Sequence, residues 1–364
     1  YNLTSLKNLV IGNSVTTIGS YAFSSCTGLK KVIWNARNAN GFQYDTPFSD
    51  CENLTDFVFG DEVEHIPDYL CYNLTSLKNL VIGNSVTTIR SHAFKGCTGL
   101  TEVTLPNAMT DIRDWAFADC TGLTEVTIPN AVTSIGSSAF SGCTGLTEVT
   151  IPNAVTDIRD GVFAYCTGLK KVIWNARNVQ NFLHNYSTYP FLSCKQLTDF
   201  VFGEEVEHIP ALLCCELASL KNLVIGNSVT SIGERAFYNC SGLQTVIWNA
   251  RNVQDLQYDL SSNILPFSGC NRLTDFVFGE EVEHIPAYLC YQLTSLNTIV
   301  IPNSVTDIGD EAFYFCTDLK TVTIGNSVKS IGDKAFYFCN GLTEVSIPNS
   351  VTDIGDEAFY FCTD

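Results

Sequence analysis

One line of sequence recurs along the whole chain. The segment CTGLTEVTIPNAVTSIGSSAF begins at Cys120, and CTGLTEVTIPNAVTDIRDGVF follows it twenty-three residues later at Cys143. Aligned on the leucine that opens LTEVTI, the line occurs fifteen times, and eleven of the fourteen steps between these leucines are 23 residues long. A fixed period of this length predicts an array of stacked structural units and not a set of unrelated globular folds.

Each line carries its own pattern of apolar residues. In LTEVTI, which opens at Leu123, apolar and polar residues alternate, as they do in a β-strand with one buried face. Pro129 and Asn130 then favour a turn. The segment SIGSSAFSGC, at 134–143, has room for only one helical or 3₁₀ turn. Each line is therefore predicted to form a strand, a turn, a short extended piece and a helical turn.

A single line cannot bury its apolar side chains, whereas a stack of lines can, because each line covers the open face of its neighbour. Successive strands run in the same direction, which predicts a parallel sheet. We expect residues 1–364 to form a single repeat solenoid of about fifteen repeats without sharp domain boundaries. The chain starts at Tyr1 without a methionine and stops at Asp364 in the middle of a line, which indicates truncation at both ends.

These lines resemble the BspA-like leucine-rich repeats, a bacterial and protist family with a 23-residue period, and the resemblance covers the whole chain. It implies a right-handed leucine-rich-repeat superhelix with a parallel β-sheet on its concave face and short helical or 3₁₀ turns on its convex face. It also implies a non-catalytic protein that is secreted or held at the cell surface and used for adhesion. The family has no catalytic residues to carry over.

The composition limits the classes of partner that this chain is expected to bind. A net charge of -18 and a pI of about 4.5 repel nucleic acid and anionic membranes. No run of eighteen apolar residues occurs, so no segment of this chain is expected to insert into a membrane. No nucleotide-binding glycine motif is present, and no histidine recurs beside a nucleophile with an orienting acid. We therefore expect no catalysis and no cofactor.

The outward-facing strand residues offer one candidate binding surface. The residue four places after each opening leucine is threonine at three successive lines, Thr104, Thr127 and Thr150. It is aliphatic at the six lines that follow, which we call the aliphatic stripe: Ile173, Val201, Val224, Ile247, Val277 and Val300. An exposed apolar stripe with a polar margin is typical of a binding site. The alternative is that valine, isoleucine and threonine simply suit strands.

The three long steps offer a second candidate. The segments 35–46, 175–189 and 249–265 follow lines that end in tryptophan and have the composition of inserted loops. Loops on a rigid scaffold often carry recognition. The loops contain aromatic residues that we expect to be exposed: Phe42, Tyr44, Tyr186, Tyr189 and Tyr258. The alternative is that these loops are tolerated insertions, because long insertions cost little.

Sixteen cysteines occur, and twelve of them occupy one position of the line that we expect to be buried and apolar. Because side chains in a stack point alike and not at each other, we expect free thiols that pack as small hydrophobic groups. The adjacent pair Cys214 and Cys215 is the exception, for which a disulfide is the alternative to free thiols. In three lines the phenylalanine position holds cysteine and the cysteine position holds leucine, as at Cys71 and Leu74, which indicates volume compensation in the core.

The line FGDEVEHIP and its two copies place a histidine beside acids, as at Glu64 and His65. A metal site is one interpretation, and cation binding by the acidic edge is another. Val63 and Ile66 occupy the buried positions of this line, so we expect Glu64 and His65 on a solvated edge, and no metal site. A zinc site has no support, because no CxxC pair occurs.

Three functions remain open from the sequence. The first is an adhesion module that binds a protein on a host cell, in the matrix or on another microbe, through the aliphatic stripe and the inserted loops. The second is a carbohydrate-binding module that uses the loop aromatics as flat surfaces for sugar rings. The third is a structural spacer within a larger surface protein.

Overall fold

The chain folds into two compact units. The computed structural model describes residues 3–44, 46–182, 189–256 and 264–362. The first unit comprises Tyr1–Val172 and Asn185–Gln196, and the second comprises Ile173–His184 and Leu197–Asp364. The division falls inside one strand, β13 (Lys171–Trp174), although the sequence period continues through it.

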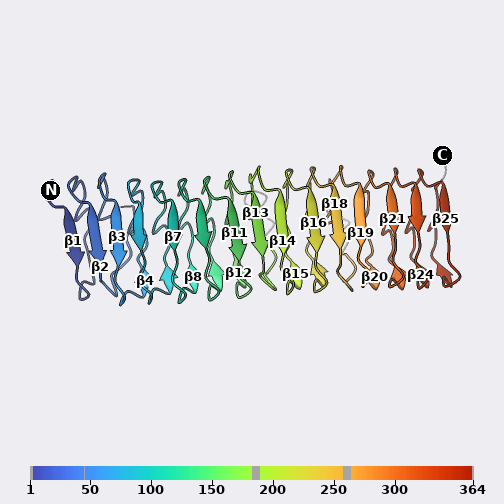
Figure 1. The fold of residues 1–364 in the computed structure, drawn as a ribbon, viewed down its shortest axis with the longest axis horizontal. Helices are drawn as coiled ribbons and strands as arrows, with labels where there is room; N and C mark the ends of the chain where they lie inside the picture. The colour runs from blue at the N-terminus through green and yellow to red at the C-terminus, as the bar shows by residue number, and fades with distance from the viewer. Residues whose placement is uncertain (1–2, 45, 183–188, 257–263, 363–364) are drawn as a thin grey trace. The chain divides into compact units, whose positions relative to one another are not determined.

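In the first unit, longer strands alternate along the chain with two-residue strands from β3 onward, and the strands of each kind lie side by side (Figure 1). The longer strands are β1 (Asn8–Ile11), β2 (Lys31–Trp34), β3 (Asp56–Phe59), β5 (Asn79–Val81), β7 (Glu102–Thr104), β9 (Glu125–Thr127) and β11 (Glu148–Ile151). The short strands are β4 (His65–Ile66), β6 (Thr88–Ile89), β8 (Asp111–Ile112), β10 (Ser134–Ile135) and β12 (Asp157–Ile158). They pair in parallel, as the repeat predicts.

The second unit repeats this plan. Its longer strands are β14 (Asp199–Phe202), β16 (Asn222–Ile225), β18 (Thr245–Trp248), β19 (Asp275–Phe278), β21 (Thr298–Val300), β23 (Thr321–Thr323) and β25 (Glu344–Ser346). Its short strands are β15 (His208–Ile209), β17 (Ser231–Ile232), β20 (His284–Ile285), β22 (Asp307–Ile308), β24 (Ser330–Ile331) and β26 (Asp353–Ile354). All of the pairings among them are parallel, so each unit is a parallel β-solenoid.

The core consists of columns of like residues. In the line that opens at Leu123, the leucine, Phe140 and Cys143 are fully buried, as predicted. The phenylalanine rings of successive turns stack, and Phe117 lies 5.2 Å from the Phe94 centroid and 5.5 Å from that of Phe140. Burying a large apolar side chain contributes about 1.5–3 kcal/mol, so contacts between turns dominate the stability. A turn taken alone would lose most of this burial.

The phenylalanine column is interrupted at Cys71, and rings from a neighbouring strand fill the gap. Phe57 meets Phe48 edge-on at 5.7 Å, Phe59 lies 4.9 Å from Phe57, and Phe59 meets Phe94 edge-on at 6.1 Å. The same bridge recurs in the second unit at Phe267, Phe276, Phe278 and Phe313. Leu74 thus fills only part of the volume that the smaller Cys71 leaves, and the rings of Phe57 and Phe59 fill the rest.

The expected helical turns are wrong: within the described residues the structure contains no helix. The segment after each short strand is a series of turns in which every second amide donates to the next turn of the solenoid. Phe117 N donates to Ala139 O at 2.8 Å, and Asp119 N donates to Ser141 O at 2.7 Å. Trp115 and Asp119 both have a φ of 59°. Amides that serve the neighbouring turn cannot also build a helix.

The cysteines form a thiol ladder. All sixteen are free thiols, including Cys214 and Cys215, and fifteen are buried. Most donate to a carbonyl oxygen of the preceding turn; Cys120 Sγ lies 3.2 Å from Phe94 O, and Cys143 Sγ lies 3.2 Å from Phe117 O. Burial raises the pKa of the Cys120 thiol to about 12. The cysteine therefore both fills the core and satisfies a buried carbonyl group.

Candidate functional site

The aliphatic stripe lies on the solvent face of the longer strands of the second unit. Parallel register places Val201 beside Val224, Val224 beside Ile247, and Ile247 beside Val277. The exposed fractions are 44% for Val201 and Val224, 39% for Ile247, 51% for Val277 and 57% for Val300, whereas Ile173 is half-buried. Neighbouring strands lie about 4.8 Å apart, so these side chains form one continuous apolar row.

An acidic hollow adjoins the stripe at the ends of its strands. Its volume is about 540 Å³, and Val224 forms part of its wall. The carboxylates of Glu204, Glu280 and Glu281 lie on its rim, and Asn227 adds an amide. Asp199 and Asp275 lie at the opposite margin of the stripe, at the start of their strands. The stripe therefore lies between the acidic hollow and a polar margin in which Asp199 and Asp275 are interspersed with the neutral residues Asn222, Thr245 and Thr298.

The last three longer strands of the first unit present a different surface at the same position, whereas Val10 and Val81, nearer its start, are aliphatic and 61% and 53% exposed. Thr104, Thr127 and Thr150 replace the aliphatic residues, and they are exposed. A hollow of about 670 Å³ over Thr127 and Thr150 is bordered by Glu125 and Glu148. The backbone pairing is the same as in the second unit. The strands around Thr127 and those around Val224 thus share the same backbone pairing and differ in the side chains that they present to solvent.

The inserted loops are described only in part. Tyr44 is 74% exposed, as expected, and Phe42 is half-buried. Tyr189 contradicts the expectation of an exposed loop aromatic, because only 8% of its surface is exposed. It is the residue just before Pro190, whose carbonyl oxygen accepts from Phe163 N, so this end of the loop is part of the core. Tyr186 and Tyr258 lie outside the described residues.

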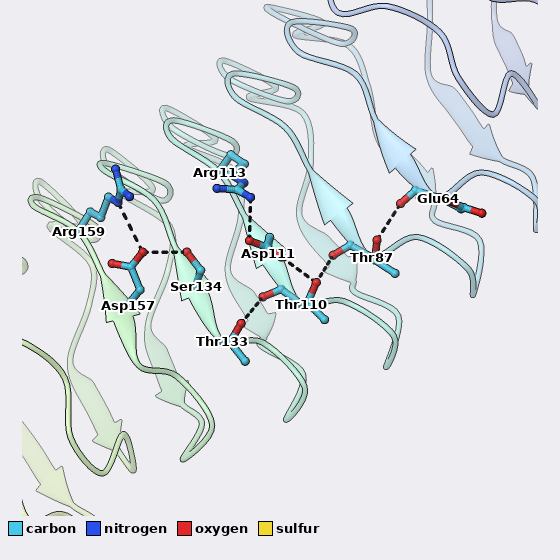
Figure 2. Close-up of polar contacts among 9 residues, drawn as sticks. All are labelled: Glu64, Thr87, Thr110, Asp111, Arg113, Thr133, Ser134, Asp157 and Arg159. Carbon is cyan, nitrogen blue, oxygen red and sulfur yellow. Dashed lines mark hydrogen bonds and ion pairs between the residues drawn. The ribbon is translucent and has the colours of Figure 1, made fainter.

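The edge formed by the short strands is held by hydroxyl groups. In the first unit Thr87 Oγ1 donates to Glu64 O at 3.3 Å, Thr110 Oγ1 donates to Thr87 O at 3.2 Å, and Thr133 Oγ1 donates to Thr110 O at 3.4 Å (Figure 2). Arg113 pairs with Asp111 at 3.0 Å along the same edge (Figure 2). This threonine ladder accounts for the threonine in the VTDI part of the line as a structural residue.

The acids of the FGDEVEHIP lines pair with arginines that the sequence reasoning did not connect to them. Each arginine comes from the WNAR segment of the preceding turn. Arg37 Nε donates to Glu62 Oε2 at 3.1 Å, Arg177 pairs with Glu207 at 2.5 Å, and Arg251 pairs with Glu281 at 3.4 Å. The arginine lowers the pKa of Glu62 by hydrogen bonding and by its charge. These exposed pairs contribute little stability but reduce the local excess of negative charge.

The three repeated histidines have different surroundings. His65 is half-buried beside the exposed Glu64, and the two do not converge with other ligands. His208 Nδ1 lies 2.7 Å from Ser231 Oγ, and its Nε2 lies 2.9 Å from Asn181 Oδ1. His284 instead lies between two carboxylates: Nδ1 contacts Asp307, and Nε2 is 3.1 Å from Asp255 Oδ1.

Among the described residues no group of three or more His, Cys, Asp or Glu side chains is placed to hold a metal ion. The same residues include no helix of the length and apolarity that a membrane span needs.

One column of half-buried aromatic residues was missed by the sequence reasoning. Tyr69 stacks on His92 at 4.4 Å, and His92 stacks on Trp115 at 6.0 Å. Lys95 Nζ lies 4.3 Å from the centroid of the Trp115 ring. The signal was present, because Tyr69, His92 and Trp115 are spaced by 23 residues and so occupy one column. Tyr44, from the first inserted loop, extends this aromatic column to four residues, with its centroid 5.4 Å from Tyr69.

A family model matches most of the chain. The model describes a BspA type leucine rich repeat region, and its six copies match residues 1–124, 64–187, 116–244 and 266–364. None of the curated proteins is a significant match.

Solved structures with the same fold include a leucine-rich repeat protein from Bacteroides ovatus. It is 24% identical, with a TM-score of 0.57, over 98% of this chain and 90% of that chain. A leucine rich cell surface protein from Faecalibacterium prausnitzii is 24% identical over 97% of this chain and 88% of that chain, with a TM-score of 0.44. A leucine-rich repeat protein from Eubacterium ventriosum is 20% identical over 98% and 88%, with a TM-score of 0.40.

Proposed function

Because the chain belongs to the BspA type leucine-rich repeat family, we propose that it is a non-catalytic adhesion module, secreted or displayed at a cell surface, that binds a protein partner. The contact surface is the aliphatic stripe of the second unit, which the inserted loops supplement. One observation carries this proposal: Val201, Val224, Ile247 and Val277 stand in register and are all exposed. Exposed apolar surface of this continuity is typical of interaction sites.

The margins indicate the chemistry of the partner. Glu204 and Glu280 border the hollow beside Val224 together with Glu281, whose charge is balanced by Arg251, and Asp199 and Asp275 border the other side. A protein segment that combines aliphatic or aromatic residues with lysine or arginine would bury the stripe and meet the acids. The proposed partner is therefore a basic and apolar protein surface on a host cell, in the matrix or on another microbe.

Peptide display tests this proposal. A library of random peptides is selected on the immobilised chain, and the enriched peptides are measured by fluorescence anisotropy. We expect enriched sequences to combine apolar and basic residues. The double variant Val224→Asp, Ile247→Asp should weaken their binding by about 100-fold, since central apolar contacts of an interface often each contribute 1–2 kcal/mol or more.

The control is the matched pair Thr127→Asp, Thr150→Asp on the first unit. It adds the same charge to the same position of the frame and should leave peptide binding unchanged. The proposal fails if the second-unit variant keeps its melting temperature and still binds the peptides as tightly as the parent chain. It fails equally if both pairs of substitutions weaken binding to the same extent.

A further inference from the structure

A small hollow in the first unit lies between two tyrosines. Its volume is about 360 Å³, and its walls include Tyr44, which the first inserted loop carries, and Tyr72. The Tyr44 ring is 74% exposed, yet it rests against Tyr69, with centroids 5.4 Å apart. The Tyr69 ring lies 5.5 Å from Tyr72 and stacks on His92. The two tyrosine walls therefore have a supporting layer of rings behind them.

The rest of the lining is polar. Asp50 and Glu52 are exposed and contribute carboxylates, and Asn73 and Thr75 contribute an amide and a hydroxyl. Ionised carboxylates only accept hydrogen bonds, so a ligand must bring donors. The same carboxylates repel an anion. The hollow thus combines aromatic walls with acceptors that face solvent, which is unlike the aliphatic stripe of the second unit.

We propose that this hollow binds a single neutral or amino sugar ring. Its volume is at the small end of the range of ligand sites, about 300–1,000 Å³, and fits a ring better than a folded peptide segment. A sugar ring has an apolar face of C–H groups that packs on the flat, amphipathic ring of a tyrosine such as Tyr44. Its hydroxyl or ammonium groups supply the donors that Asp50 and Glu52 require.

The chemistry also excludes part of the sugar class. A uronic or sialic acid would place its carboxylate near Asp50 and Glu52, where like charges repel. Selectivity for neutral and amino sugars over acidic sugars is therefore part of the proposal. The site belongs to the first unit and uses none of the residues of the aliphatic stripe, so its test is separate from the test of the stripe, although it shares Tyr44 with the first inserted loop.

Calorimetric titration of the full chain tests the site. The probes are N-acetylglucosamine, glucosamine and methyl glucopyranoside, with glucuronic acid as the acidic sugar. We expect saturable binding of at least one neutral or amino sugar, and binding of glucuronic acid weaker by at least about tenfold. Tyr44→Ala should weaken binding by about tenfold, because it removes an aromatic wall.

Two controls separate this site from other effects. Tyr165→Ala removes an exposed tyrosine of the same unit that does not line the hollow, and it should not change sugar binding. The Val224→Asp, Ile247→Asp variant should likewise leave it unchanged, because the stripe is elsewhere. The proposal is overturned if none of the neutral or amino sugars binds saturably, if Tyr44→Ala binds as tightly as the parent chain, or if glucuronic acid binds tightest.

Discussion

The solvent faces of the longer strands around Thr127 in the first unit and around Val224 in the second differ, although the interiors of these two regions do not. In the first unit Thr127 faces solvent between strand residues that point inward, and Val126 is 4% exposed. In the second unit Val224 faces solvent at the same position, and Leu223 is 1% exposed. The pairing in parallel register is the same. The inward positions are constrained by packing against two neighbouring turns, whereas the outward positions need only suit a strand.

This difference bears on why the aliphatic stripe exists. Threonine and valine have similar shapes and both favour strands, so the first unit demonstrates that the frame tolerates a hydroxyl at this position. Val224 and Val277 are exposed to water in the second unit and gain little from folding. Val10 and Val81 of the first unit are also exposed at this position, so it is the unbroken run of aliphatic residues in the second unit that supports the proposed interaction.

The largest expected effect tests the claim that the interiors are equivalent. Phe117→Ala in the first unit and Phe313→Ala in the second should each reduce the free energy of unfolding by about 3–5 kcal/mol, because each leaves a cavity in a stack of rings. Phe117 stacks between two rings, and Phe313 stacks on Phe336 at 5.0 Å and meets Phe278 edge-on at 6.4 Å. Hydrogen exchange in each unit, measured across a urea series, would detect both losses.

Thr127→Ala serves as the control, since it truncates an outward side chain without opening a cavity. A large loss in one unit and a negligible loss in the other would contradict the equivalence of the interiors, and with it the comparison of their outer faces.

Much of the frame could be predicted from the sequence because the period itself encodes it. A residue that recurs every 23 positions packs against the equivalent residue of the neighbouring turn. The buried columns that contain Leu123, Phe140 and Cys143 follow directly from this. The helical turns could not be predicted correctly. Whether Phe117 N donates within its own turn or to Ala139 of the next turn depends on the distance between turns, which no residue pattern records.

The candidate sites were less predictable than the frame. Alternation placed Val224 and Ile247 on the outer face, and their exposure confirms that placement. The loop aromatics had no period to place them, and Tyr189 proved to be buried while Tyr44 is exposed. The Tyr44–Tyr72 hollow depends on a loop returning over the next turn, which composition alone does not specify.

A smaller effect is expected when the outer faces are made alike. Val224→Thr with Ile247→Thr converts part of the stripe to the chemistry of the first unit. It should change the free energy of unfolding by less than about 0.5 kcal/mol per site, since both residue types suit an exposed strand. Binding of the selected peptides should fall by about tenfold, because apolar contact area is lost without added charge. Urea unfolding and fluorescence anisotropy measure the two quantities.

The reverse substitutions, Thr127→Val with Thr150→Ile, provide the matched control for stability and should be equally mild. If the threonine variant of the second unit unfolds much more readily than the parent chain, the stripe is needed for the fold, and the argument for a partner loses its basis.

The smallest expected effect concerns the edge of the short strands, where histidines at equivalent positions have different neighbours. His208 lies between Asn181 and Ser231, and burial lowers the pKa of His208 below its usual value of 6.5. The folded state then binds fewer protons than the unfolded state in the pH range between the two pKa values. Stability is therefore present above pH 6.5 and declines as the pH falls through that range.

His208→Gln removes this group, so the free energy of unfolding should depend less on pH between 7 and 5 than in the parent chain. Hydrogen exchange of the second unit at both pH values measures the slope. Asn227→Gln, which changes no titrating group, should keep the parent slope. If the His208 variant keeps the slope of the parent chain, burial beside Asn181 and Ser231 does not make the free energy of unfolding depend on pH. His208 and His284, which faces Asp255 and Asp307 at the equivalent position, would then differ in their neighbours without a demonstrated effect of the His208 neighbours on stability.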